Sequence, residues 1–249
     1  MSHRRARSRP WDDEGGASTG EEARPVEPAG PGRAAGEHET LTDFAVDEIR
    51  KKIVLGWLPP GAKLRVDPLA KELAVSRVPV REAFRELLAE GLAEVYPRRG
   101  AVVSEIRRHD VEDGYRMLEL MEVMAAERVA ATASAETAER MRPHLLRLKE
   151  LATDPDPLEH LLAHRAFHFE VFSALGPGML QRTARMMWHA SERHINTSAR
   201  GERLHQAYHE HSELVRFFEE GDTVGAVAMT RMHVAHGCQA ALRGLGFAG

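Results

Sequence analysis

Apolar periodicity between residues 39 and 104 predicts three short helices. Thr42 is placed to cap the first, because a threonine hydroxyl can accept a hydrogen bond from the first helical turn. Asp67 and Pro68 open the second, since proline is tolerated at the first helical position. Ser76 is placed to cap the third, and a tight turn separates it from the second. Two short helices joined in this way predict a helix-turn-helix.

The third predicted helix combines a packed face with a basic stripe. Its apolar face carries Val80, Ala83, Phe84, Leu87 and Leu88. Arg77, Arg81 and Arg85 repeat every four residues, roughly 100° round from that face at 3.6 residues per turn. Planar, permanently charged guanidinium groups suit guanine and phosphate in a major groove. The stripe favours DNA binding, although a surface helix with Arg–Glu pairs would share the pattern.

A basic hairpin follows this helix. Residues 92–96 and 101–103 are predicted as two short strands, joined by the turn Pro97-Arg98-Arg99-Gly100. A basic tip beside a candidate recognition helix suits contact with phosphate or the minor groove. A helix-turn-helix with a basic wing points to double-stranded DNA more specifically than either part does.

Residues 110–246 have helical periodicity without a convincing strand pattern. Turn signals lie near Pro143, Asp154 to Pro157, Gly176 to Gly178, Gly201 and Gly221. Short connections favour antiparallel neighbours, so we expect a helical bundle. The predicted fold class is therefore mainly α, with an N-terminal winged helix-turn-helix that has a small β wing and a C-terminal antiparallel all-α bundle.

Composition adds one boundary and several exclusions. Residues 1–38 are rich in glycine, proline and charge, so we expect a disordered tail. Residues 39–108 are the net-positive part of a chain whose overall charge is −4. The single cysteine, Cys238, excludes a disulfide framework and fits a reducing, cytoplasmic compartment. No apolar run approaches the roughly 18 residues of a membrane span, and no secretory signal is expected.

Twelve of the 14 histidines lie from position 109 onward, and four of them fall on predicted apolar faces. His164 and His168 are four residues apart and share one helix face. His211 lies on an apolar stripe, and His233 lies among small apolar residues. Neutral imidazoles that converge would suit Zn, Ni or Cu. The spacing alone favours the simpler alternative of four partly buried histidines with ordinary hydrogen bonds.

The stretch "GWLPPGAKLRVDPLAKELAVSRVPVREAFRELLAEGLAEVYPRRGAVV" resembles the winged helix-turn-helix of GntR-type bacterial transcription regulators. The core "SRVPVREAFRELLAEGL" is similar to that family's signature nearly position by position. The resemblance implies operator contacts from the recognition helix and the wing tip, at Ser76, Arg77, Arg81, Arg99 and Gly100. Arg85 joins this set from the basic stripe alone.

The C-terminal segment resembles the all-helical FCD effector domain of the FadR-like GntR subfamily. "DVEDGYRMLELMEVMAAERVAA" is similar to its opening helix, "HRAFHFEVFSALG" to its "DxxFH" helix, and "EHSELVRFFEEGDTVGAVAMTRMHV" to its closing helices. Many such domains bind a divalent metal. The resemblance places the ligands at His164, His168, His211 and His233.

Two positions depart from that family pattern. His164 stands where the family has an aspartate ligand, so a four-histidine site would keep the full charge of the ion and favour nitrogen-loving metals such as Zn or Ni. Leu118 stands where an arginine four residues before Glu122 often grips a carboxylate effector. The resemblance therefore implies an effector without identifying it as a carboxylate.

We therefore expect a cytoplasmic, homodimeric DNA-binding regulator whose operator affinity depends on a small-molecule effector in the helical domain, and the resemblance favours repression. The expected segments are the tail 1–38, the DNA-binding domain 39–104, a linker 105–109 and the effector-binding and dimerisation domain 110–246. One alternative is a metal sensor in which the ion itself is the effector. A metalloenzyme is the other, although no zincin-like Glu, Ser–His–Asp set or phosphate loop supports it.

Overall fold

The computed structural model describes residues 40–247, and the tail expected at residues 1–38 lies outside this range. The described chain divides into two units, each of which is treated by itself. The first unit consists of residues 40–52 and 59–104, and the second consists of residues 53–58 and 105–247.

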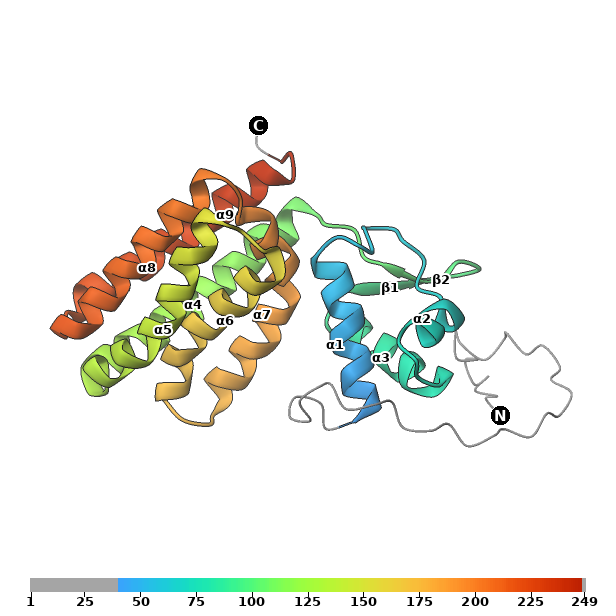
Figure 1. Ribbon diagram of the computed structural model, residues 1–249, viewed down its shortest axis with the longest axis horizontal. Coiled ribbons are helices and arrows are strands. Elements are labelled where there is room, and N and C mark those ends of the chain that lie inside the picture. Colours follow the sequence, from blue (N-terminus) through green and yellow to red (C-terminus); the bar gives the residue numbers. More distant parts are fainter. Residues whose placement is uncertain (1–39, 248–249) are drawn as a thin grey trace, which may run out of the picture. The chain divides into compact units, whose positions relative to one another are not determined.

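The first unit contains three helices and a two-stranded antiparallel hairpin (Figure 1). In chain order these are α1 (Leu41–Val54), α2 (Val66–Glu72), α3 (Arg77–Ala89), β1 (Ala93–Tyr96) and β2 (Gly100–Val103). The strands pair in register from Ala93 opposite Val103 to Tyr96 opposite Gly100. An isolated bridge from Lys63 to Val102 ties the segment before α2 to this hairpin. The predicted winged helix-turn-helix is therefore confirmed.

Two of the three helix starts differ from the predictions, and the third keeps its predicted N-cap residue without the capping hydrogen bond. Thr40, and not Thr42, caps α1, because its Oγ1 accepts from the Asp43 amide at 3.1 Å. Arg65 is the N-cap residue of α2, so the predicted Asp67 cap is wrong and the helix starts at Val66, earlier than predicted. Pro68 is tolerated in the first turn because the amides there have no intrahelical acceptor. Ser76 does occupy the N-cap position of α3, but its side chain makes no capping hydrogen bond.

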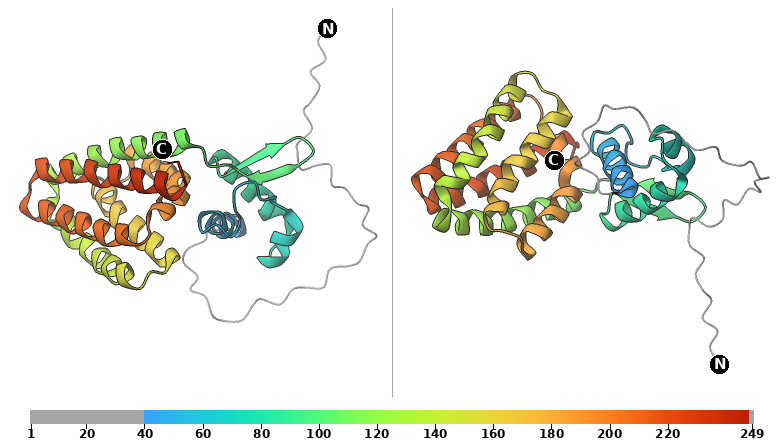
Figure 2. Two further views of the ribbon diagram at one scale, coloured as in Figure 1. Left: turned by 90° about the horizontal axis from the view of Figure 1, so that it is seen from above. Right: turned by 60° about the horizontal axis from the view of Figure 1, so that its bottom comes forward.

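The second unit contains six described helices in an antiparallel bundle, which Figure 2 shows from two further sides. They are α4 (Arg108–Thr132), α5 (Ser134–Thr153), α6 (Pro157–Ala174), α7 (Met179–Ser198), α8 (Glu202–Glu220) and α9 (Thr223–Gly244). α4 packs on α9 and α7, while α5 packs on α8 and α6. The predicted bundle is confirmed, although α4 begins at Arg108, inside the segment expected as the linker.

Most predicted turns coincide with helix ends, but the turn at Pro143 is wrong. Pro143 lies inside α5, where its missing amide removes one helical hydrogen bond. The helix continues because buried residues on both sides of the proline, including Met141 and Leu148, pack into the bundle. Tertiary packing here outweighs a local cost of about 3 kcal/mol.

Capping side chains fix the start of two helices that carry candidate ligands. Asp156 accepts from the Glu159 amide at 2.8 Å, with Pro157 as the first residue of α6. Asp222 accepts from the Gly225 amide at 2.9 Å at the start of α9. Gly221 ends α8 in the left-handed region, with φ 65°, which is accessible to glycine at little cost.

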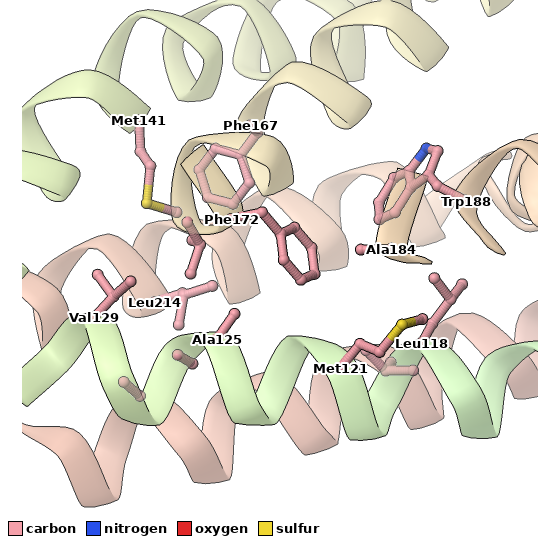
Figure 3. Close-up of a cluster of buried hydrophobic side chains, with 14 of the residues drawn as sticks. Leu118, Met121, Ala125, Val129, Met141, Phe167, Phe172, Ala184, Trp188 and Leu214 are labelled. Carbon is pink, nitrogen blue, oxygen red and sulfur yellow. The ribbon is translucent and has the colours of Figure 1, made fainter. Parts of the chain in front are cut away.

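An apolar core joins the inner faces of the bundle (Figure 3). Phe172 of α6, Met121 of α4 and Leu214 of α8 extend into the space between these helices, and Trp188 of α7 lies further along. Close packing of this kind fixes the rotation of each helix about its axis. Among the described residues, no helix combines the length and apolarity that a bilayer span requires.

Candidate functional site

The candidate recognition helix α3 presents its arginines to one side of its packed face. Val80, Ala83, Phe84 and Leu87 are buried, while Ser76, Arg77 and Arg85 are exposed and Arg81 is partly exposed. The apolar face anchors α3 to its own unit. The basic stripe therefore remains on the surface, where a DNA groove could reach it.

Carboxylates accompany two of these arginines. Arg77 Nε lies 2.6 Å from Asp67 Oδ1 of α2, and Arg85 Nη1 lies 2.5 Å from Glu82 Oε1. Exposed ion pairs of this kind contribute about 0–1 kcal/mol, so phosphate can displace them at little cost. Arg81 differs, because its buried Nε has no hydrogen-bond partner among the described residues.

The wing tip is basic and tightly turned. Arg99 donates its amide to the Tyr96 carbonyl at 3.1 Å, which closes the turn. Arg98 and Gly100 both have left-handed backbone, with φ 66° and 74°. Arg98 and Arg99 are exposed, so Arg98 offers a charge that the sequence-based set of site residues left out.

In the second unit, the four candidate ligand histidines meet. His164 and His168 come from α6, His211 from α8 and His233 from α9, and one ligand nitrogen from each lies within 4.8 Å of the others. Nε2 of His168 is 3.2 Å from Nε2 of both His164 and His211, and Nε2 of His211 is 3.2 Å from that of His233. All four side chains are buried.

Three of the six nitrogen–nitrogen separations, each 3.2 Å, match those around a tetrahedral ion. Zn–N bonds of about 2.0–2.1 Å imply nitrogen–nitrogen separations of about 3.3 Å in tetrahedral geometry. Burial lowers the pKa of His164 and of His211 well below the usual range, and the neighbouring imidazoles and Arg203 lower it further. Neutral imidazole is the form that binds a metal, so this cluster has the chemistry of a ligand set.

Two buried carboxylates contact the Nδ1 atoms of His168 and His233, and the sequence alone did not indicate this role. Glu122 Oε2 of α4 lies 3.1 Å from His168 Nδ1, and Glu210 Oε2 of α8 lies 2.7 Å from His233 Nδ1. Glu210 also contacts His236 Nδ1 at 2.7 Å and Arg203 Nη1 at 2.9 Å. Glu210 precedes His211 directly in sequence, but neighbouring helical positions face different directions, so adjacency gave no signal.

The charge of Glu210 is stabilised by its neighbours. Burial alone would raise the pKa of this carboxyl, but hydrogen bonds from His233 and His236, with the charge of Arg203, bring its pKa down to about 2. The side chain therefore remains a carboxylate at neutral pH.

A cavity opens beside the histidines. His164, His168 and His233 form part of its wall, together with Tyr115, Leu118, Trp188, Ile195, Ser198, Arg203 and Leu204. Leu118 contributes an apolar surface at the position where the resemblance leads one to expect arginine. Arg116, two residues before Leu118 and on another face of α4, is exposed and pairs with Glu119 at 2.7 Å. Arg203 of α8 is the guanidinium that reaches this wall among the described residues, a role the sequence did not indicate.

A winged helix-turn-helix followed by a helical bundle with an internal cavity defines a class of DNA-binding regulators. The chain matches the model of the bacterial regulatory proteins of the gntR family over residues 41–103 and that of the FCD domain over residues 113–236. It is 32% identical over 199 residues to the "Probable D-xylose utilization operon transcriptional repressor" of Paenarthrobacter nicotinovorans, covering 78% of this chain and 84% of the relative. The chain belongs to the GntR family.

Solved structures agree on the fold. McbR of Escherichia coli superposes with a TM-score of 0.72 at 18% identity, covering 83% of this chain and 99% of that one. A GntR regulator from Rhodococcus sp. RHA1 gives 0.69 at 22% identity, covering 84% and 99%. The two family matches and the 32% identical relative make the protein a transcriptional regulator with a GntR helix-turn-helix and an FCD domain, and the metalloenzyme alternative is wrong.

Proposed function

We propose that this regulator is a cytoplasmic, homodimeric repressor whose operator affinity is controlled by a small molecule bound in the cavity of the FCD domain, next to a divalent metal. The observation that carries the proposal is the meeting of four buried imidazole nitrogens, three of which, those of His164, His168 and His233, belong to residues that line the cavity. A relative is named a transcriptional repressor, which supports the direction of regulation.

The DNA contacts are assigned to Ser76, Arg77, Arg81, Arg85, Arg99 and Gly100. The four arginines supply guanidinium groups at the surface of α3 and at the wing tip. Two copies in a homodimer would place two recognition helices on the half-sites of a pseudo-palindromic operator. Phosphate contacts would give general affinity, and base contacts from α3 would give specificity.

His164, His168, His211 and His233 would hold the metal. Four neutral ligands leave the full charge of a divalent ion in place, so it would attract a lone-pair donor of the effector. All-nitrogen ligation favours Zn or Ni over Mg, Ca or Mn. Effector binding would then alter the equilibrium between arrangements of the two winged units, through the segment at residues 105–109.

The test of DNA binding is a fluorescence-anisotropy titration with a duplex from the promoter beside this gene. We expect binding at least about 10³-fold tighter than to a random duplex at physiological salt. Arg81→Ala should weaken specific binding by about 5- to 150-fold. Arg147→Ala, an exposed arginine of α5, serves as the matched control and should leave binding unchanged. Equal binding of specific and random duplexes would overturn the proposal.

A second candidate function is metal sensing, with the ion as the effector. It is favoured by the fact that the chain alone supplies four ligand nitrogens, so an ion can be bound without a metabolite. A chelator titration of the protein–operator complex separates the two functions. Metal sensing is supported if removal of the metal alone changes the operator Kd in either direction. An unchanged operator Kd supports a metal that only anchors the effector.

A further inference from the structure

The four candidate ligands are of two kinds. His168 and His233 each have Nδ1 within hydrogen-bonding distance of a buried carboxylate, at 3.1 and 2.7 Å. His164 and His211 have buried Nδ1 atoms that find no hydrogen-bond partner among the described residues. The ligand set is therefore anchored at one imidazole of α6 and one of α9.

We infer that Glu122 and Glu210 are positioning residues of the metal site, which hold His168 and His233 in the ligating tautomer and supply the negative charge that His164 does not. The inference rests on the proposed metal site. Each carboxylate contacts the Nδ1 atom of its histidine, whereas the candidate ligand atom is Nε2 on the other side of the ring. The carboxylates therefore act on the metal site through the imidazole rings.

The tautomer argument follows from the geometry. A carboxylate is an acceptor only, so a neutral imidazole beside it carries its proton on Nδ1. Nε2 of the same ring then presents a lone pair, and in both residues Nε2 points toward the cluster, 3.2 Å from Nε2 of His211. Two of the four ligand atoms are thus oriented before any ion arrives. Hydrogen bonds of this type also raise the basicity of the ligand.

Charge provides the second argument. Four imidazoles bring no negative charge to a divalent ion, and transferring that charge into a buried site is unfavourable unless it is compensated. Glu122 and Glu210, at 6% and 5% exposure, are the buried acids that contact candidate ligands among the described residues. Arg203 offsets part of the charge of Glu210. The charge of Glu122 should therefore contribute more to the metal affinity than the charge of Glu210 does.

Glu122 also makes the cleaner test. Its one polar contact among the described residues is His168, whereas Glu210 joins His233, His236 and Arg203. Glu122→Gln removes the charge but keeps an acceptor, and Glu122→Leu removes both at similar size. Glu127→Gln, at an exposed position of the same helix, is the matched control.

The experiment measures Zn²⁺ and Ni²⁺ dissociation constants of the full chain by competition with a chromophoric chelator. We expect a 10- to 100-fold weaker Kd for Glu122→Gln, a greater loss for Glu122→Leu and no change for Glu127→Gln. Histidine ¹⁵N spectra of the metal-free protein should show Nδ1–H tautomers at His168 and His233, and Glu122→Leu should lose that tautomer at His168.

The outcomes separate the two claims. A wild-type protein that binds neither ion overturns the metal site and this inference with it. A wild type that binds, together with Glu122→Gln and Glu210→Gln variants that bind equally well, overturns the inference alone. Circular dichroism shows whether Glu122→Leu folds. If it does not, the d–d spectrum of bound Co²⁺ is compared between wild type and the Glu122→Gln and Glu210→Gln variants. An unchanged spectrum in both variants counts against the inference.

Discussion

Acid should destabilise the metal-free FCD domain well before its carboxylates titrate. Burial is the main cause that lowers the pKa of His160 and of His194 to about 4, from an ordinary value of 6.5. Both rings are less than one-tenth exposed, and neither nitrogen of His194 has a hydrogen-bond partner among the described residues. The folded state thus binds fewer protons than the unfolded state at mildly acidic pH.

The magnitude follows from this difference. Stability from a histidine with a lowered pKa is complete above about pH 6.5 and is lost as the pH falls from there toward 4. At pH 5, about 1.5 units below the unfolded value, each of the two histidines costs about 2 kcal/mol. Together they remove about 4 kcal/mol, a large part of the 5–15 kcal/mol typical of a folded protein.

The assay is urea unfolding followed by circular dichroism from pH 7.5 to pH 5, with a chelator present so that metal binding does not contribute. His194→Leu, which keeps the site apolar, should reduce the loss between these pH values by about 2 kcal/mol. His209→Gln, at an exposed position, should leave it unchanged. A free energy of unfolding that is constant within about 1 kcal/mol over this range, or a loss that is the same in His194→Leu, would show that these buried histidines do not cause the acid sensitivity.

Four further predictions concern DNA, metal and packing. Arg81→Ala should cost about 1–3 kcal/mol of operator binding and relax sequence preference, measured by anisotropy on operator variants. Arg99→Ala should reduce the salt slope of log K by about 1 with little change in sequence preference, since a phosphate contact carries no base information; an unchanged slope counts against it. His211→Ala should lose stoichiometric zinc after gel filtration, by metal analysis, while retaining its helical spectrum. Gly225→Ala should destabilise by about 1–3 kcal/mol in urea unfolding, because the added Cβ would lie 2.2 Å from Phe217 Cδ1; a neutral effect would contradict this.

The DNA-binding unit could be predicted in some detail from the sequence. The apolar face of α3 is carried by closely spaced residues, and a period of 3.6 places Val80, Phe84 and Leu87 together in any helix. The basic turn of the wing is likewise a local signal. The helix caps were harder, because Thr40 and Thr42 both offer a hydroxyl, and the choice between them depends on where the chain before the helix turns.

The bundle shows where local reasoning fails. Pro143 is a turn signal by propensity, yet buried neighbours on both sides keep α5 continuous. The inward faces of His164, His168, His211 and His233 could be predicted helix by helix. The sequence could not assign roles to Glu122, Glu210 and Arg203, since these roles depend on contacts between different helices. The pattern of one helix does not show which of its residues will contact a histidine of another helix.

Control of DNA binding by the FCD cavity is tested with a small molecule that a thermal-shift screen finds to bind the metal-loaded protein. Its effect on operator Kd is measured by anisotropy for wild type and for His211→Ala. We expect the ligand to change the operator Kd about 5- to 150-fold in wild type, which is the range of a typical coupling free energy, and not to change it in the variant. An operator Kd that the ligand leaves unchanged in wild type, or shifts equally in both proteins, would contradict control of DNA binding through the histidine-walled cavity.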